Sequence, residues 1–141
     1  MKVFSTDQII NGRFFSLWLN GDLHAEVKTA SAESTLDTEK VNIAGQLGSE
    51  EIVTGASGAG SMTFHKVFGD LGKEINQCIK DGKPFIFDLI SELYNPNTEE
   101  YERVVIENCK ITKFKAIDAD ISKLLESSYD FTYNPNNVTF E

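Results

Sequence analysis

The two histidines, His24 and His65, are the first candidates for a metal ligand or a general base. Each is a lone member of a segment in which apolar and polar residues alternate, without a cysteine or carboxylate at ligand spacing. Protein zinc sites need three or four such groups at defined spacings. We therefore interpret both histidines as ordinary strand residues and predict no metal site.

Carboxylates are the next groups that could do chemistry. The Asp-x-Asp-x-Ser run at 118–122 resembles the start of a calcium loop, but Lys123 stands where that loop requires glycine and no glutamate follows at its twelfth position. The pairs Glu50-Glu51 and Glu99-Glu100 are typical of solvated loops rather than of an acid and base pair. The carboxylates therefore indicate neither a calcium site nor a hydrolytic centre.

Glycines and cysteines complete the search for chemistry. The spacing of Gly55, Gly58 and Gly60 is not the dinucleotide fingerprint, and the chain contains neither a phosphate-binding P-loop nor a GxSxG elbow. Cys78 and Cys109 form no CxxC pair, so we expect two buried thiols rather than a disulfide or metal site. The sequence predicts a protein that is not an enzyme and that binds no cofactor.

The composition fits one globular domain spanning residues 1–141. Hydrophobic residues make up 40% of the chain, and its ten phenylalanines suffice for a core. The N-terminus lacks the apolar region of a signal peptide, and no stretch approaches the roughly 18 apolar residues of a membrane span. We expect a cytosolic, soluble product that does not enter a membrane.

The net charge is −9, from 22 acidic and 13 basic residues. Affinity for a phosphate backbone comes from Lys and Arg that displace counterions. A protein this acidic is not expected to hold nucleic acid, although it could surround it without binding.

The segment 13–28 has the pattern of a β-hairpin. Apolar residues alternate with polar ones on both sides of Asn20-Gly21, and Asn-Gly is the strongest short hairpin signal because a type I′ turn needs φ > 0 at both central residues. Trp18 lies on the otherwise polar face, which indicates that this face is partly covered.

Residues 38–54 show neither a helix period nor a strand period. Their apolar residues are scattered among glycines and acidic residues, and a long loop of this kind inside a domain is usually functional. We expect a partner-contacting loop here. The segment 54–68 follows, in which a glycine run leads into an alternating strand at Met62 and Phe64. This run is either a surface loop or a contact surface for another copy of the chain.

The segment 69–81 is the one predicted helix. Leu71, Ile75, Cys78 and Ile79 form an apolar stripe at helical spacing, Asp70 is a candidate cap, and Gly82 ends the helix. The stripe is narrow, so the helix should pack by one side on a sheet.

The remaining chain reads as strands. One follows Pro84, a second covers 101–117 with a change of parity that predicts a bulge near Asn108, and a third closes with alternating aromatics at 129–133. Residues 134–141 are expected to be a flexible tail. The predicted fold is mainly β, a barrel or sandwich of antiparallel strands with one flanking α-helix.

The order and spacing of these segments resemble the XkdM-like tail tube proteins of contractile phage tails, defective prophages and phage-tail-like bacteriocins. The resemblance covers residues 11–133, and its motifs are structural rather than catalytic. Its most specific parts are Val41-Asn42-Ile43 with Gly45, and Thr54-Gly55-Ala56 through Gly60 into Thr63-Phe64 and Lys66-Val67.

The resemblance implies a subunit of the inner tail tube, which joins sheets in hexameric rings that stack into a channel. Its implied partners are identical copies, a sheath protein, a baseplate or tube initiator, and DNA only as non-specific cargo in the lumen. Assembly would occur in the cytoplasm of a bacterial host, and the product would be a tail or tail-like particle. The expected inter-subunit contacts are Val41, Ile43, Leu47, Ile52, Gly55, Gly58 and Gly60; the expected channel-facing residues are Glu26 and Asp88.

Two alternatives stay open at this point. A small-ligand-binding β-barrel of lipocalin type would be a stable monomer with an apolar cavity. The tube protein of a type VI secretion device would share the architecture of the tail tube. The sequence does not decide whether the particle is an infectious phage, a defective prophage or a bacteriocin.

Overall fold

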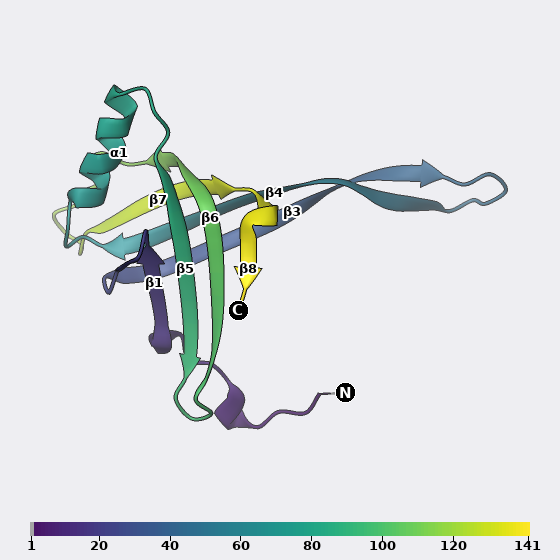
Figure 1. The fold of residues 1–141 in the computed structure, drawn as a ribbon, viewed down its shortest axis with the longest axis horizontal. Coiled ribbons are helices and arrows are strands. Elements are labelled where there is room, and N and C mark those ends of the chain that lie inside the picture. Colours follow the sequence, from purple (N-terminus) through teal and green to yellow (C-terminus); the bar gives the residue numbers. More distant parts are fainter. Residues whose placement is uncertain (1) are drawn as a thin grey trace.

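The computed structural model describes residues 2–141 and contains eight strands and one α-helix (Figure 1). All strand pairings are antiparallel, in the order β2-β1-β5-β6-β7-β4-β3, with β8 paired to β6. This architecture confirms the predicted fold class. The elements are β1 (Phe15–Leu19), β2 (Asp22–Leu23), β3 (Val27–Asn42), β4 (Ser49–His65), α1 (Asp70–Lys80), β5 (Ile86–Asn95), β6 (Glu100–Phe114), β7 (Glu126–Tyr133) and β8 (Val138–Phe140).

The sheet folds over itself into two layers whose strands cross. Strands β1, β5, β6 and β8 form one layer, and β7, β4 and β3 form the other (Figure 1). Side chains from both layers meet between them, as where Phe87 of β5 packs edge to face on Phe131 of β7 with ring centroids 5.7 Å apart. The buried core consists of Leu17, Leu19, Met62, Phe64, Ile75, Phe87, Leu89, Ile106, Cys109, Tyr129, Phe131 and Tyr133.

The predicted hairpin is confirmed at its turn. Asn20 and Gly21 have φ of 51° and 86°, and Trp18 pairs with Leu23 across the turn. The second strand is shorter than expected, because β2 ends at Leu23 and the chain turns again before β3. The Asn20 side chain accepts a hydrogen bond from the backbone amide of Asp88, which ties the turn to β5.

The predicted bulge near Asn108 is also confirmed. Phe87 pairs with Cys109 and Leu89 pairs with Ile106, so one residue of β5 opposes two residues of β6. Asn108 has φ of 56°, and its backbone amide donates to Asp88 Oδ1 at 3.1 Å. The bulge lets β6 bend from one layer toward the other.

Helix α1 forms within the predicted range and buries Ile75 against the sheet. The expected cap is wrong, because Gly69 occupies the N-cap position and Asp70 is the first helical residue. Asp70 still favours the helix, since a negative charge in the first turn faces the positive end of the helix dipole. Gly82, with φ of 71°, follows the end of the helix as predicted.

The loop expected over 38–54 is instead the distal part of a long hairpin. Strands β3 and β4 stay paired from Val27↔Phe64 to Asn42↔Ser49, and the turn contains only residues 43–48. We call residues 35–57 the arm, because the pairing of β4 with β7 ends at Gly58 and the hairpin projects away from the body (Figure 1). Both faces of the arm are exposed, and a register shift at Asp37/Thr38 interrupts the alternation, so no period-2 pattern was visible.

The tail expected to be flexible is ordered. Asn134 accepts a hydrogen bond from the backbone amide of Asn136, and residues 138–140 form β8 on the edge of β6. The amide of Glu141 donates to the carbonyl of Arg103 at 2.8 Å. Strand β7 pairs only with the C-terminal half of β6, so β8 pairs with an edge that would otherwise be open.

Candidate assembly surfaces

The glycines predicted as contacts occupy two different environments. A Cβ on Gly58 would lie 2.5 Å from the Tyr133 ring, and a Cβ on Gly60 would lie 2.3 Å from the Ser31 carbonyl oxygen and 2.5 Å from the Phe131 ring. Packing within a single chain therefore explains why these two positions are glycine, since the missing side chain lets β4 approach β3 and the aromatic residues of β7. Gly55 belongs to the arm, where the nearest atom to an added Cβ is Asp37 Oδ2 at 3.2 Å.

The arm carries apolar side chains on both of its faces. Cross-strand partners share a face of the ribbon. The pairs Glu39↔Ile52 and Val41↔Glu50 lie on one face, which we call the acidic arm face. Val41 is 40% exposed and Ile52 is 51% exposed. The structure thus brings together two of the predicted contact residues and adds two carboxylates to them.

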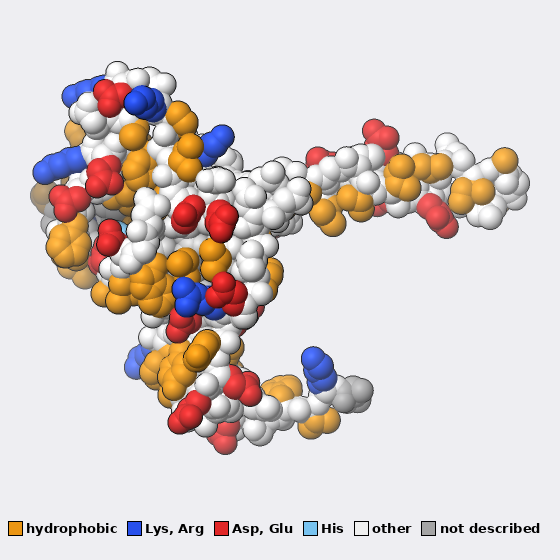
Figure 2. Space-filling view, viewed as in Figure 1, with side chains coloured by type: hydrophobic (Ala, Val, Ile, Leu, Met, Phe, Trp, Pro, Cys, Tyr) orange, Lys and Arg blue, Asp and Glu red, His pale blue; other side chains and the backbone are white. Residues whose placement is uncertain are grey.

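The opposite arm face and the turn complete this surface. Val53 is 61% exposed on the opposite face, beside Thr38. Ile43 and Leu47 lie in the turn at the end of the arm, and Leu47 is fully exposed. Figure 2 shows hydrophobic and acidic side chains along the whole arm.

The two residues predicted to face a channel lie at different kinds of position. Asp88 is exposed on the outer side of β5, because its neighbours Phe87 and Leu89 point into the core. Glu26 lies half-buried in the turn before β3, and its Oε1 is 2.8 Å from His24 Nδ1. Whether either residue faces a channel stays a prediction.

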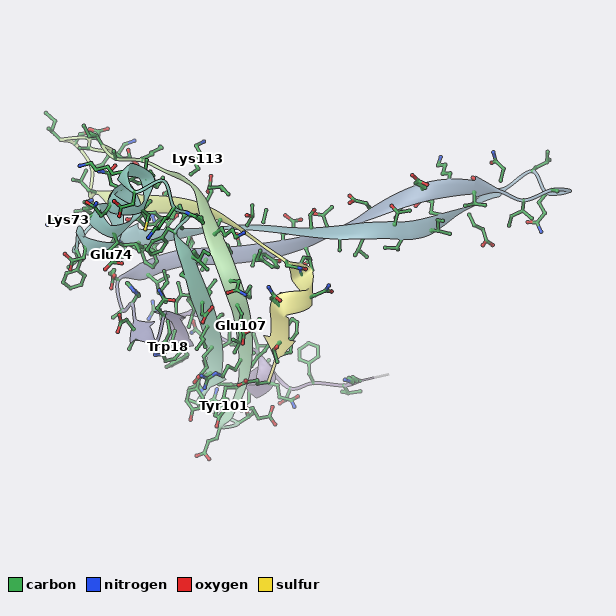
Figure 3. The ribbon with its side chains drawn as sticks, turned by 45° about the horizontal axis from the view of Figure 1, so that its top comes forward. Trp18, Lys73, Glu74, Tyr101, Glu107 and Lys113 are labelled. Atoms are coloured by element: carbon green, nitrogen blue, oxygen red, sulfur yellow. The ribbon has the colours of Figure 1, made fainter. Side chains whose placement is uncertain are left out.

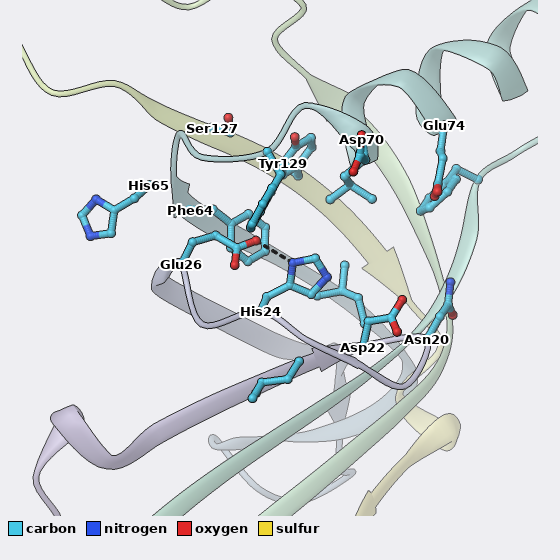
Figure 4. A pocket seen from close by; sticks show the side chains of 15 residues that line it. Asn20, Asp22, His24, Glu26, Phe64, His65, Asp70, Glu74, Ser127 and Tyr129 are labelled. Carbon is cyan, nitrogen blue, oxygen red and sulfur yellow. Dashed lines mark hydrogen bonds and ion pairs between the residues drawn. The ribbon is translucent and has the colours of Figure 1, made fainter.

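A pocket of about 280 Å³ surrounds the pair of His24 and Glu26 (Figure 4). The carboxylates of Asp22, Asp70 and Glu74 also line it, and the His24 ring lies over the Phe64 ring at a centroid distance of 5.4 Å. His24 therefore follows the end of β2 and contacts the Glu26 carboxylate, a partner that the sequence analysis did not predict. Among residues 2–141, no three His, Cys, Asp or Glu side chains are grouped closely enough to hold a metal ion.

A groove of about 400 Å³ between α1 and β6 was not predicted from the sequence. Ile79 of α1 borders it and is 60% exposed, while Lys83 and Lys113 stand at its rim. We call this surface the α1–β6 groove; its lining residues are Ile75, Ile79, Lys83, Pro84, Phe85, Ile111, Thr112, Lys113 and Phe114. The helical stripe gave no signal for the groove, because the sequence does not show that Ile79 lacks a core partner while Ile75 has one.

Burial raises the pKa of the Cys109 thiol from 9.0 to about 12, and the nearby Asp88 carboxylate adds to the effect. The unfolded chain loses this proton near pH 9, whereas the folded chain keeps it. We therefore expect the free energy of unfolding to fall as pH rises from 9 toward 12. Urea denaturation at pH 8, 9 and 10 should show this decrease.

Cys109→Ala is the control for this pH dependence. In this variant the free energy of unfolding should change less between pH 9 and 10 than in the wild type. Above pH 10 it should still fall in both proteins, because burial also raises the pKa of Tyr129. An equal slope in the two proteins between pH 9 and 10 would show that Cys109 is not its source.

No helix within residues 2–141 is both long and apolar enough to cross a bilayer. A family model described as phage tail tube protein matches residues 2–138 of the chain. The protein XkdM of the phage-like element PBSX from Bacillus subtilis strain 168 is 29% identical over 131 residues, which are 92% of this chain and 89% of XkdM.

Two solved structures show the same fold at low sequence identity. The sheath/tube terminator of the extracellular contractile injection system PVC, in its extended state, superposes with a TM-score of 0.77 and 14% identity over 97% of this chain and 99% of the other. A chain of the six-fold symmetrised anti-feeding prophage baseplate superposes with a TM-score of 0.70 and 11% identity. The match covers 98% of this chain and 97% of the other.

Proposed function

The chain belongs to the phage tail tube protein family, and from this premise we propose that it is a structural subunit of the inner tube of a contractile phage tail or phage-tail-like particle. Identical copies would close into hexameric rings, and the rings would stack into a channel. The six-fold symmetry of the baseplate that holds a chain of the same fold supports this ring size. The role is architectural, and no catalytic step is part of the proposal.

The projecting arm is the observation that carries this function. A single copy leaves Val41, Leu47, Ile52 and Val53 exposed to water on a two-stranded ribbon that pairs with no third strand. Isolated two-stranded ribbons are marginally stable in water. Association with other copies would bury these side chains and hold the ribbon in place.

The acidic charge supports a channel through which DNA passes without being held. A net charge of −9 repels phosphates. We propose that Glu26 and Asp88 face this channel, and that the outer partners are a sheath protein and a baseplate or tube initiator. Assembly would take place in the host cytoplasm before the particle is complete.

Negative-stain electron microscopy tests the function. The purified chain at high concentration, mixed with its baseplate proteins, should form tubes of constant diameter with six-fold symmetry in end views. Size-exclusion chromatography of the same sample should show material far larger than one chain. A protein that remains monomeric in the presence of these proteins and takes up apolar dyes would instead support a ligand-binding barrel.

A further inference from the structure

We propose that the acidic arm face of one copy docks in the α1–β6 groove of a second copy. This inference rests on the proposed function and adds the surface that receives the arm. The occupant is a defined segment of a second copy of this chain, centred on Val41 and Ile52 with Glu39 and Glu50 beside them.

The groove has the chemistry of a docking site for an apolar segment with acidic edges. Its floor is apolar, with Ile75 buried and Phe85, Ile111 and Phe114 half-buried, and Ile79 borders it. Lys83 and Lys113 are exposed at the rim, and neither belongs to an ion pair among residues 2–141. Two lysine ammonium groups therefore stand beside an uncovered apolar surface.

The arm supplies the complementary charges. Within residues 35–57 there are four carboxylates, Asp37, Glu39, Glu50 and Glu51, and one base, Lys40. Glu39 and Glu50 share a face with Ile52 and Val41. Seating this face in the groove would bury apolar side chains of both copies and bring carboxylates to the lysines of the rim. Such complementarity selects the partner and its orientation.

The geometry requires two copies. The arm leaves the body at the end opposite α1, so it cannot reach the groove of its own chain (Figures 1 and 3). Its β3 part, residues 35–42, extends for about 25 Å at the rise of a strand. Lys113 lies beside α1, at the far end of the molecule from the arm (Figure 3). Contacts between unlike surfaces repeat from copy to copy, and they produce rings or stacked assemblies.

Charge reversal on both surfaces tests the inference with full-length chains. Tube yield is measured by sedimentation and negative stain under conditions in which the wild type assembles. The arm variant E39K/E50K and the groove variant K83E/K113E should each reduce tube yield at least about ten-fold, because like charges meet in the interface. The variant with all four substitutions should recover at least about half of the wild-type yield.

K73E/K80E is the matched control. Lys73 and Lys80 are exposed on α1 but do not line the groove, so this variant reverses the same number of lysine charges on the helix beside the groove. It should assemble as the wild type does, and thermal melts should show that all variants fold.

The outcomes separate the inference from the proposed function. Two results would overturn the docking surface and leave the tube function standing. In the first, the wild type forms tubes and K83E/K113E forms them equally well. In the second, the protein with all four substitutions assembles no better than the two double variants. A wild type that forms no tubes under any of these conditions would overturn the function and the docking surface together.

Discussion

Gly60→Ala is expected to lower the free energy of unfolding by about 3 kcal/mol, which is the upper range for overpacking a close-packed core. The added methyl group would lie 2.3 Å from the backbone oxygen of Ser31 and 2.5 Å from the Phe131 ring. Phe131 is almost fully buried against Phe87, and the Ser31 carbonyl belongs to the paired strand β3. The Ser31 carbonyl cannot move without disturbing the pairing of β3 with β4, and the Phe131 ring cannot move without losing its packing on Phe87.

Chemical denaturation of the unassembled chain measures this effect. Gly48→Ala is the matched control, because nothing lies within 4 Å of an added Cβ in the turn of the arm, and it should change stability by less than about 0.5 kcal/mol. Gly58→Ala should lie between the two, since the three atoms nearest to its added Cβ all belong to the Tyr133 side chain and none to the backbone. A Gly60→Ala protein as stable as Gly48→Ala would contradict the close approach of β4 to β3.

Removal of the outer arm is expected to abolish tube assembly while the body stays folded. Residues 38–54 are replaced by Asn-Gly, which joins the paired residues Asp37 and Gly55 through a two-residue turn. Electron microscopy should then show no tubes. The melting temperature should stay within about 4 °C of the wild type, a change that corresponds to roughly 1 kcal/mol or less, because the arm does not contribute to the core.

A milder variant separates the contacts of the arm from its length. Val41→Ser with Ile52→Ser keeps the hairpin and removes the apolar side chains of one face. Tube yield should fall strongly in this variant as well. Normal tubes from the shortened protein would show that assembly uses other surfaces of the molecule.

Those parts of the fold that depend on local chemistry were predictable. Asn20-Gly21 specifies its turn, the spacing of Leu71, Ile75 and Cys78 specifies a helix, and the change of parity along 101–117 located the bulge at Asn108. Each of these signals lies within a few residues of the structure that it produces. The aromatic alternation at 129–133 likewise identified strand β7, which lines the core.

The arm and the C-terminal strand could not be predicted, because both are set by distant pairing. Residues 38–54 face water on both sides, so no apolar stripe distinguished a ribbon from a loop. Strand β8 depends on an edge of β6 that β7 leaves open, which is a property of the assembled sheet. The same limit applies to the α1–β6 groove, whose wall residues come from three separate segments.

The contact residues expected from the resemblance lie in different environments, and their contact role stays a prediction. Val41, Leu47 and Ile52 are exposed in the single chain. Gly58 is buried beneath Tyr133, and a glycine run has the same appearance in a sequence whether it makes room for another copy or for a ring of its own chain. The neighbour that needs the space is 75 residues away, so the sequence pattern alone did not identify it.

The pairing of β8 with β6 also protects the sheet against unwanted association. An open strand edge presents unpaired amide and carbonyl groups that another chain can pair with. Residues 138–140 occupy the β6 edge at 104–106. This part of the edge is therefore closed to a strand of a second copy, and copies must meet through other surfaces.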